Sequence, residues 1–261
     1  MSDKVDQIAQ AMKAAHEAGE GYRNFDGDLA PGSVAEAYAA QARLHALHAA
    51  QGRGKLGGRK IALASKVQQE LCGVDHPIAG GIFADEIMAS PASVEAGHYH
   101  GLGVEFELAV KLSHDLTGPG GPYSKDMIAA SIASVHPAFE LIIDRGADYA
   151  NLDALTMIVD NAWCAGVVLG PELPGWRALD LDELPVALYW NDDPPVAART
   201  GLADPLGSLA WVANLVTSMG ATMQASEIVI PSSVIQNRDP VPGDTMRYEL
   251  AGMAGVELAV T

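Results

Sequence analysis

Hydrophobic positions near the start of the chain follow a helical period. Apolar side chains recur three or four positions apart from Val5 onward and again through residues 33–50, where Ser33 and Glu36 match a Ser-x-x-Glu capping box. A run of glycines between positions 52 and 58 then interrupts this pattern. We therefore predict a small N-terminal helical lobe over residues 1–57.

The pattern changes after Gly58, where short β-rich runs are separated by Gly and Pro. Only a few helical segments interrupt these runs, and the clearest begins at Asp204 as N-cap and ends before Gly220. This mixture predicts an α+β fold in which residues 58–261 form an antiparallel-rich mixed β-roll or barrel. Helices are expected at 125–134, 153–161 and 205–219, and strands at 60–64, 93–95, 104–112, 138–143, 164–169, 186–190, 227–230, 245–250 and 256–260.

The charge balance narrows the choice of partners. The chain has 16 Lys and Arg against 33 Asp and Glu, a net charge of −17, and such a field repels nucleic acid and anionic membranes. We therefore set nucleic acid and membranes aside as partners, and an anionic substrate would need a local positive centre such as a metal ion, lysine or arginine. No apolar run approaches the roughly 18 residues of a membrane span, and residues 1–20 lack a signal-peptide core, so we expect a cytoplasmic protein.

The candidate chemistry lies in three glutamates on two predicted strands. Glu105 and Glu107 are two positions apart, so their side chains share one face of a strand. Glu140 is a lone carboxylate inside another apolar strand, where burial without a partner is costly. A solvated strand face or a shared proton would also account for the first pair. Three carboxylates converging on one point would instead suit a hard cation, Mg²⁺ or Mn²⁺.

These motifs together resemble the fumarylacetoacetate hydrolase superfamily, in its vinylpyruvate hydratase and oxalocrotonate decarboxylase branch. The Glu-x-Glu strand followed by Pro-Ala-x-Glu at 137–140 resembles the metal triad of that family. The resemblance covers roughly residues 58–243, and each motif is weak alone while their order is specific. The other matching segments are 58–66 (GRKIALASK), 71–77 (LCGVDHP), 160–162 (Asp-Asn-Ala) and 204–214 (DPLGSLAWVAN).

The resemblance implies a role for each matching residue. Glu105, Glu107 and Glu140 become the metal ligands, with Glu107 counted among the catalytic residues. Lys60 becomes the pocket lysine that holds the substrate carboxylate or assists enolisation. A surface lysine on an edge strand is the alternative for Lys60. The remaining candidates are Asp160 for catalysis, and Lys66, Asn161, Ser232 and Ser233 for substrate binding. A capping pair at a helix end is the alternative for Asp160 and Asn161.

The implied activity is that of a metal-dependent lyase for a small 2-keto or 2-hydroxydienoic acid. A metal-stabilised enolate would serve hydration of 2-keto-4-pentenoate, which we favour, decarboxylation of 4-oxalocrotonate, or C–C hydrolysis. A decarboxylase also needs a group for a second carboxylate, for which Arg145, Arg199 and Arg238 are candidates. The resemblance further implies a homo-oligomer, and a complex with a pathway partner enzyme is a second expectation that it carries.

Two departures from the family pattern weigh on this activity. Residues 77–81 read Pro-Ile-Ala-Gly-Gly where the family has an aspartate that is a candidate proton carrier, and Ala79 cannot move a proton. Trp163 follows the Asp-Asn-Ala motif where small serines are frequent, so it should narrow or reshape the pocket. Both motivate an alternative in which the chain is a weakly active partner subunit of a hydratase or decarboxylase.

Overall fold

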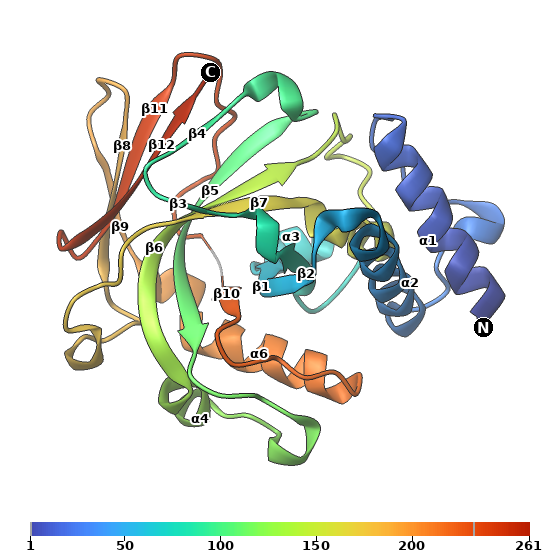
Figure 1. The fold of residues 1–261 in the computed structure, drawn as a ribbon, viewed down its shortest axis with the longest axis horizontal. Coiled ribbons are helices and arrows are strands. Elements are labelled where there is room, and N and C mark those ends of the chain that lie inside the picture. Colours follow the sequence, from blue (N-terminus) through green and yellow to red (C-terminus); the bar gives the residue numbers. More distant parts are fainter. Residues whose placement is uncertain (1, 232) are drawn as a thin grey trace.

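The N-terminal region folds as two packed helices on one side of the molecule (Figure 1). The structure, a computed structural model, describes residues 2–231 and 233–261. Helix α1 (Ser2–Glu17) packs on α2 (Val34–His48) through buried Ile8 and Leu44, as the helical period predicts. The predicted capping box is only half formed. Ser33 accepts from the Glu36 amide, but the Glu36 carboxylate accepts from the preceding Gly32 amide at 2.6 Å.

Two open sheets make up the rest of the fold, so the α+β expectation is confirmed. Most pairings are antiparallel, whereas β1–β10, β3–β7 and β4–β12 are parallel. Over residues 2–231 and 233–261 neither sheet closes on itself, so the mixed sheets form no closed barrel. One sheet has the order β2 (Ile78–Phe83), β1 (Leu56–Ala62), β10 (Ile228–Ile230), β5 (Leu102–Leu112), β6 (Ile132–Ile143), β7 (Cys164–Leu169) and β3 (Ile87–Ala89), and the other has β4 (Ala92–Val94), β12 (Ala254–Val260), β11 (Thr245–Leu250), β8 (Pro185–Trp190) and β9 (Val196–Arg199).

The two sheets meet around Phe106, in the middle of β5. Its ring contacts Phe139 on β6 at 6.0 Å between centroids, and Trp190 and Tyr248 of the second sheet at 6.4 and 6.1 Å. Such aromatic contacts bury large apolar areas in the core. Because neighbouring side chains on a strand alternate in direction, this packing leaves Glu105 and Glu107 on the opposite face of β5.

Four more α-helices, α3 to α6, follow the N-terminal pair. The observed elements correct the sequence prediction at two points. Helix α4 ends at Ala130 rather than residue 134, because Ile132 already pairs with Leu112 as the start of β6. Helix α3, with strands β2, β3 and β9, was not expected. The bounds are α3 (Lys66–Leu71), α4 (Lys125–Ala130), α5 (Ala154–Val159) and α6 (Pro205–Ser218).

The N-cap of α6, Asp204, leads to a prediction about the stability of the fold. Its side chain accepts from the Gly207 amide at 3.2 Å, as the sequence predicts. We expect Asp204→Ala to lower the free energy of unfolding by about 1 kcal/mol, because it leaves a helix N–H without its cap. Urea denaturation measures this, and Asp204→Asn, which keeps a cap oxygen, should lose less. An equal loss in both variants would show that the ion pair with Lys125 carries the effect instead.

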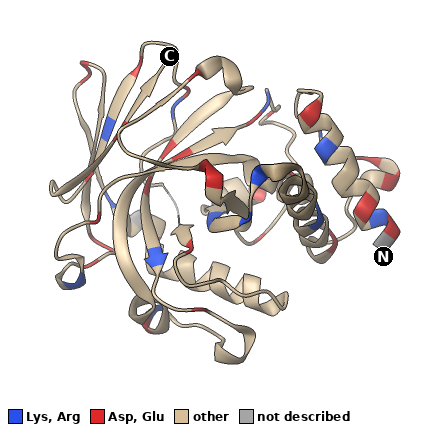
Figure 2. Ribbon diagram, in the orientation of Figure 1, with Lys and Arg blue, Asp and Glu red and all other residues tan. Residues whose placement is uncertain are grey.

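The acidic residues are spread over helices, strands and loops rather than gathered on one element (Figure 2). No helix in the described part of the chain is long and apolar enough to cross a membrane. Cys72 and Cys164 are both free and buried.

Candidate active site

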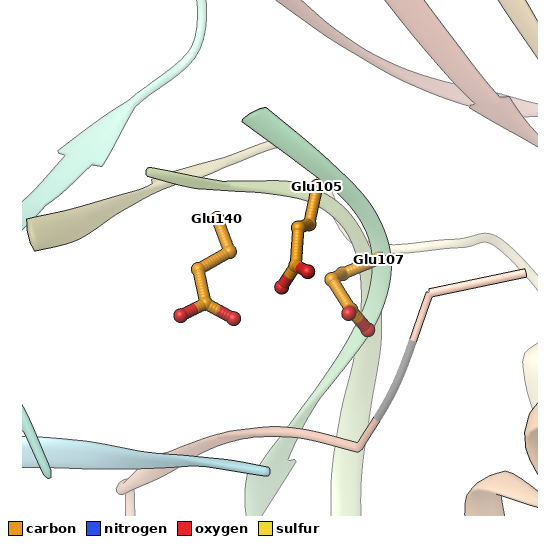
Figure 3. A group of neighbouring side chains, drawn as sticks. All are labelled: Glu105, Glu107 and Glu140. Atoms are coloured by element: carbon orange, nitrogen blue, oxygen red, sulfur yellow. The ribbon is translucent and has the colours of Figure 1, made fainter. Parts of the chain in front are cut away.

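The register between β5 and β6 brings the three predicted glutamates together. Glu105 lies directly opposite Glu140, and Glu107 lies one step further along the same face of β5. Each offers a carboxylate oxygen, and these oxygens lie within 4.8 Å of one another. The three side chains project to the same side of the two strands (Figure 3). The structure therefore assembles the arrangement that the sequence predicts.

Lys60 on β1 faces this cluster from the side. Its Nζ lies 2.9 Å from Glu140 Oε1 and donates to the Ala162 carbonyl at 3.1 Å, with Lys60 only 1% exposed. Burial lowers the pKa of Lys60, but the carboxylates of Glu140 and then Glu105 raise it by more, so the net pKa lies above its ordinary value. Lys60 is therefore an ammonium ion in the protein interior, not the surface lysine of the alternative.

Burial makes the charged form of Glu140 costly, and Lys60 offsets only part of that cost. Burial raises its pKa to about 8, and repulsion from Glu105 adds to this, while Lys60 opposes it. Glu140 Oε1 has the Lys60 ammonium at 2.9 Å, and among the described residues neither Glu140 oxygen accepts a hydrogen bond from a backbone N–H or a hydroxyl group. Buried carboxylate oxygens with acceptor capacity left over are the atoms that a hard cation binds.

The cluster opens into a cavity of about 470 Å³. Lys60, Glu105 and Glu107 line its charged end. Leu71, which is 66% exposed, and Gln68 bring α3 to the same cavity. The size suits a small organic acid. The other walls are largely apolar and include Leu63, Ile142, Leu152, Met157, Trp163 and Ile235.

A left-handed turn formed by residues 161–163 closes the cavity beside Lys60. Asn161, Ala162 and Trp163 have φ values of 56°, 49° and 62°. A left-handed backbone costs roughly 1–2 kcal/mol per residue for side chains other than glycine, so the surrounding contacts must hold this turn in place. Such strain is concentrated at functional sites in proteins.

Comparisons with known proteins find relatives that span almost the whole chain. A 2-keto-4-pentenoate hydratase of Dechloromonas aromatica is 31% identical over 252 residues, covering 95% of this chain and 94% of the relative. A 4-oxalocrotonate decarboxylase of Pseudomonas putida is 25% identical over 256 residues, covering 97% and 96%. The structure of 4-oxalocrotonate decarboxylase from Pseudomonas putida G7, complexed with magnesium and adipate, superposes with a TM-score of 0.89 at 23% identity, covering 100% of this chain and 98% of that one. No family model matches the chain.

The chain belongs to the fumarylacetoacetate hydrolase superfamily. Within it, the chain lies in the branch of the 2-keto-4-pentenoate hydratases and 4-oxalocrotonate decarboxylase, as its motifs predict. Its relatives there are lyases, and this chain is a hydratase- or decarboxylase-like member of the superfamily.

The Asp-Asn-Ala motif of this superfamily lies beside the cavity without lining it through Asp160 or Asn161. Asp160 is 4% exposed, contacts His16 Nε2 at 2.5 Å and pairs with Arg145. The Asn161 amide clamps the Gly81 backbone, accepting from its N–H at 2.6 Å and donating to its carbonyl at 2.8 Å. Both side chains face a second cavity of about 250 Å³, so substrate contact through them stays a prediction.

The other predicted substrate-binding residues are not all brought to the cavity. Lys66 is the exposed first residue of α3 and does not line it. Ser233 does, but its hydroxyl also bonds with the backbone of Phe106 and the Ile235 carbonyl, which fixes β5 between its two glutamates. Ser232 lies outside the described residues.

The two departures from the superfamily pattern have clear places in the fold. Ala79 is buried in β2, where its N–H donates to the Tyr38 hydroxyl at 2.9 Å. Trp163 lines both cavities and is held edge-on by Tyr22 and Tyr149. It therefore forms part of the wall of both cavities, and the narrowing of the pocket stays a prediction.

The contribution of Ala162 could not be predicted from sequence. Its carbonyl oxygen, the Lys60 partner, is present in every residue type and leaves no sequence signal. Only the paired Gly80 and Gly81 hinted that something approaches β2 closely.

Proposed function

We propose that this protein is a Mg²⁺- or Mn²⁺-dependent hydro-lyase that adds water to a small 2-keto-4-enoic acid with a single carboxylate. The observation that carries this proposal is a cavity lined by Glu105, Glu107 and the Lys60 ammonium, with Glu140 converging on the two glutamates and the other walls mainly apolar or uncharged. The names of the 2-keto-4-pentenoate hydratases among its relatives support the same reaction.

The residues fit a hard divalent cation. Glu105, Glu107 and Glu140 supply oxygen ligands only, and among the described residues the Glu140 oxygens accept no hydrogen bond from a backbone N–H or a hydroxyl group. All-oxygen sets favour Mg²⁺ or Mn²⁺ over zinc, which favours nitrogen and sulfur ligands. When bound there, such a cation supplies Lewis acidity to the oxygens of a 2-keto acid.

The chain's own contribution begins with Lys60. As an ammonium with a raised pKa it keeps its proton and binds a substrate carboxylate by a charge-assisted hydrogen bond, rather than acting as a base. Leu152, Met157 and Ile235 then receive the carbon chain and exclude water from it. A tail that carries charge would be desolvated against these residues at a cost.

The positions of the arginines favour a hydratase over a decarboxylase. Arg145 pairs with Asp160 behind Trp163, and Arg199 donates to the Glu183 carbonyl on an exposed edge. Arg238 stacks over Trp190. Among the described residues that line the triad cavity there is no arginine, so a second carboxylate would find no bidentate partner there.

A comparison of substrates tests the proposal. With Mg²⁺, we expect turnover of vinylpyruvate with a kcat/KM at least about tenfold above that for 4-oxalocrotonate. The second carboxylate of 4-oxalocrotonate would be buried in the cavity without a partner, which should cost more than the roughly 1.36 kcal/mol that corresponds to a tenfold ratio. Ultraviolet absorbance follows the loss of the conjugated substrate, and an EDTA-treated sample is the control. Preference for 4-oxalocrotonate with release of CO₂ would establish the decarboxylase instead, and cleavage of an acylpyruvate would establish the C–C hydrolase.

The partner-subunit alternative has its own outcome. Buried Ala79 offers no proton carrier, which is the observation that favours weak activity. Absence of turnover on each of these acids, together with absence of Mg²⁺ and Mn²⁺ binding by calorimetry, would support that alternative. The homo-oligomer and any complex with a pathway enzyme remain proposals, which light scattering of the purified protein addresses.

A further inference from the structure

The left-handed turn of residues 161–163 is buried and is anchored by side-chain contacts from several elements. Asn161 makes two hydrogen bonds to Gly81, and its Oδ1 also lies 2.7 Å from His45 Nε2. Asp160, the residue before the turn, is tied to His16 and Arg145. Side chains from α1 and α2, the backbone of β2 and Arg145 after β6 therefore converge on this short segment.

The turn and Lys60 meet through a glycine. Gly80 on β2 is the register partner of Lys60 on β1. A Cβ at Gly80 would collide with the Asn161 carbonyl oxygen, so only glycine lets the turn lie directly against β2 at this point. This close approach places the Ala162 carbonyl 3.1 Å from Lys60 Nζ.

The Ala162 carbonyl accepts one of the N–H groups of the Lys60 ammonium and so limits the number left for a ligand. Of the three N–H donors of Lys60, one faces Glu140 and one is taken by Ala162. No third partner for Nζ is found in residues 2–231 and 233–261, and Lys60 lines the triad cavity. A fixed carbonyl on one side thus leaves one donor for a ligand in the cavity.

We propose that Asn161 is a positioning residue for Lys60. By clamping Gly81 it holds the left-handed turn on β2, so that the Ala162 carbonyl orients the Lys60 ammonium toward the substrate carboxylate. This inference rests on the proposed function, because it takes Lys60 as the group that binds that carboxylate. It also gives the Asp-Asn-Ala motif a role at the active site without substrate contact through Asn161.

The chain offers a matched control for Asn161. Asn214 on α6 clamps the Tyr123 backbone in the same way, accepting from its N–H at 2.7 Å and donating to its carbonyl at 3.0 Å. Asn214 does not line the triad cavity. Asn214→Ala therefore removes an equivalent pair of hydrogen bonds at a place that has no contact with Lys60.

A double-mutant cycle tests the proposal with the full chain and Mg²⁺. We expect Asn161→Ala to lower kcat/KM for vinylpyruvate about tenfold or more, and to weaken pyruvate binding in calorimetry, with Mg²⁺ affinity changed less than about twofold. In a Lys60→Met background, Asn161→Ala should cause less than about a twofold further loss, because the group it positions is gone. Asn214→Ala should keep wild-type kinetics.

The outcomes separate this inference from the proposed function. A full tenfold loss in the Lys60→Met background, or wild-type kinetics in Asn161→Ala, would overturn the positioning role alone. If Asn161→Ala does not fold, Asn161→Asp, which keeps the two acceptor contacts, should show a smaller loss of the same kind. If the wild type neither turns over nor binds pyruvate, the proposed function fails. A crystal structure of Asn161→Ala then decides, since an unchanged Lys60–Ala162 contact would refute the positioning role.

Discussion

Replacing Glu107 by glutamine is expected to abolish Mg²⁺ and Mn²⁺ binding and to lower kcat/KM by at least about a hundredfold. The amide is close in size to the carboxylate, so the fold should persist, but the change removes one of the three carboxyl groups that converge beside the cavity. Replacing a residue that only hydrogen-bonds to a metal ligand typically lowers metal affinity or activity 10- to 100-fold. Replacing a ligand itself should lower them by more. Calorimetric titration with Mn²⁺ and turnover of vinylpyruvate measure the two effects.

Thermal unfolding provides a readout of this variant that needs no substrate. Because a cation that binds only the folded state stabilises it, Mg²⁺ should raise the Tm of the wild type and leave that of Glu107→Gln unchanged. Without metal, the variant should be at least as stable as the wild type, since one like-charge repulsion is relieved. Glu257→Gln, on an exposed position of β12, is the control and should respond to Mg²⁺ as the wild type does. A Tm rise and full activity in Glu107→Gln would show that the triad is not the metal site.

The glutamate cluster could be predicted from sequence because its signals are local. Alternation along a strand places Glu105 and Glu107 on one face whatever the rest of the chain does. Glu140 was predictable because an isolated carboxylate in an apolar strand needs a partner. The register that puts Glu105 opposite Glu140 is a tertiary fact, and sequence supplied it only through the family resemblance.

The elements that were missed depend on contacts with distant segments. Strand β2 contains Gly80 and Gly81, which read as a break, yet β1 on one side and the Asn161 clamp on the other hold it extended. The end of α4 at Ala130 is set by the pairing of β6 with β5, which local helix propensity does not reveal. In contrast, the capping box at Ser65 and Gln68 that begins α3 is a local signal that the pattern contained.

The roles of Asp160 and Asn161 show a different limit of sequence reasoning. The motif marks both residues as important, but a motif does not say whether a side chain faces a substrate or a backbone. In the structure both side chains are consumed by His16, Arg145 and Gly81, so their effect on chemistry passes through the turn that follows them. A pair of polar residues can therefore belong to an active-site motif although neither side chain lines the substrate cavity.

Replacing Lys60 by methionine is expected to lower kcat/KM for vinylpyruvate about 10- to 100-fold while metal binding is retained. A hydrogen bond between charged groups contributes roughly 1.5–3 kcal/mol, and each 1.36 kcal/mol is tenfold. Among the described residues that line the cavity, Lys60 is the positively charged side chain, so the loss should appear chiefly as a higher KM and weaker pyruvate binding. Lys66→Met, at the exposed start of α3, is the matched control and should leave both constants unchanged.

The same variant should also reveal how Lys60 and the cation share Glu140. Removing one partner of a buried ion pair typically costs about 3–5 kcal/mol, so the metal-free Lys60→Met protein should unfold at a lower Tm than the wild type. A divalent cation replaces the missing counter-charge, so Mg²⁺ should raise the Tm of Lys60→Met by more than it raises that of the wild type. If Lys60→Met instead keeps its KM and its pyruvate affinity while losing stability, the buried ammonium serves only to neutralise Glu140. The substrate carboxylate must then be held by another group in the cavity.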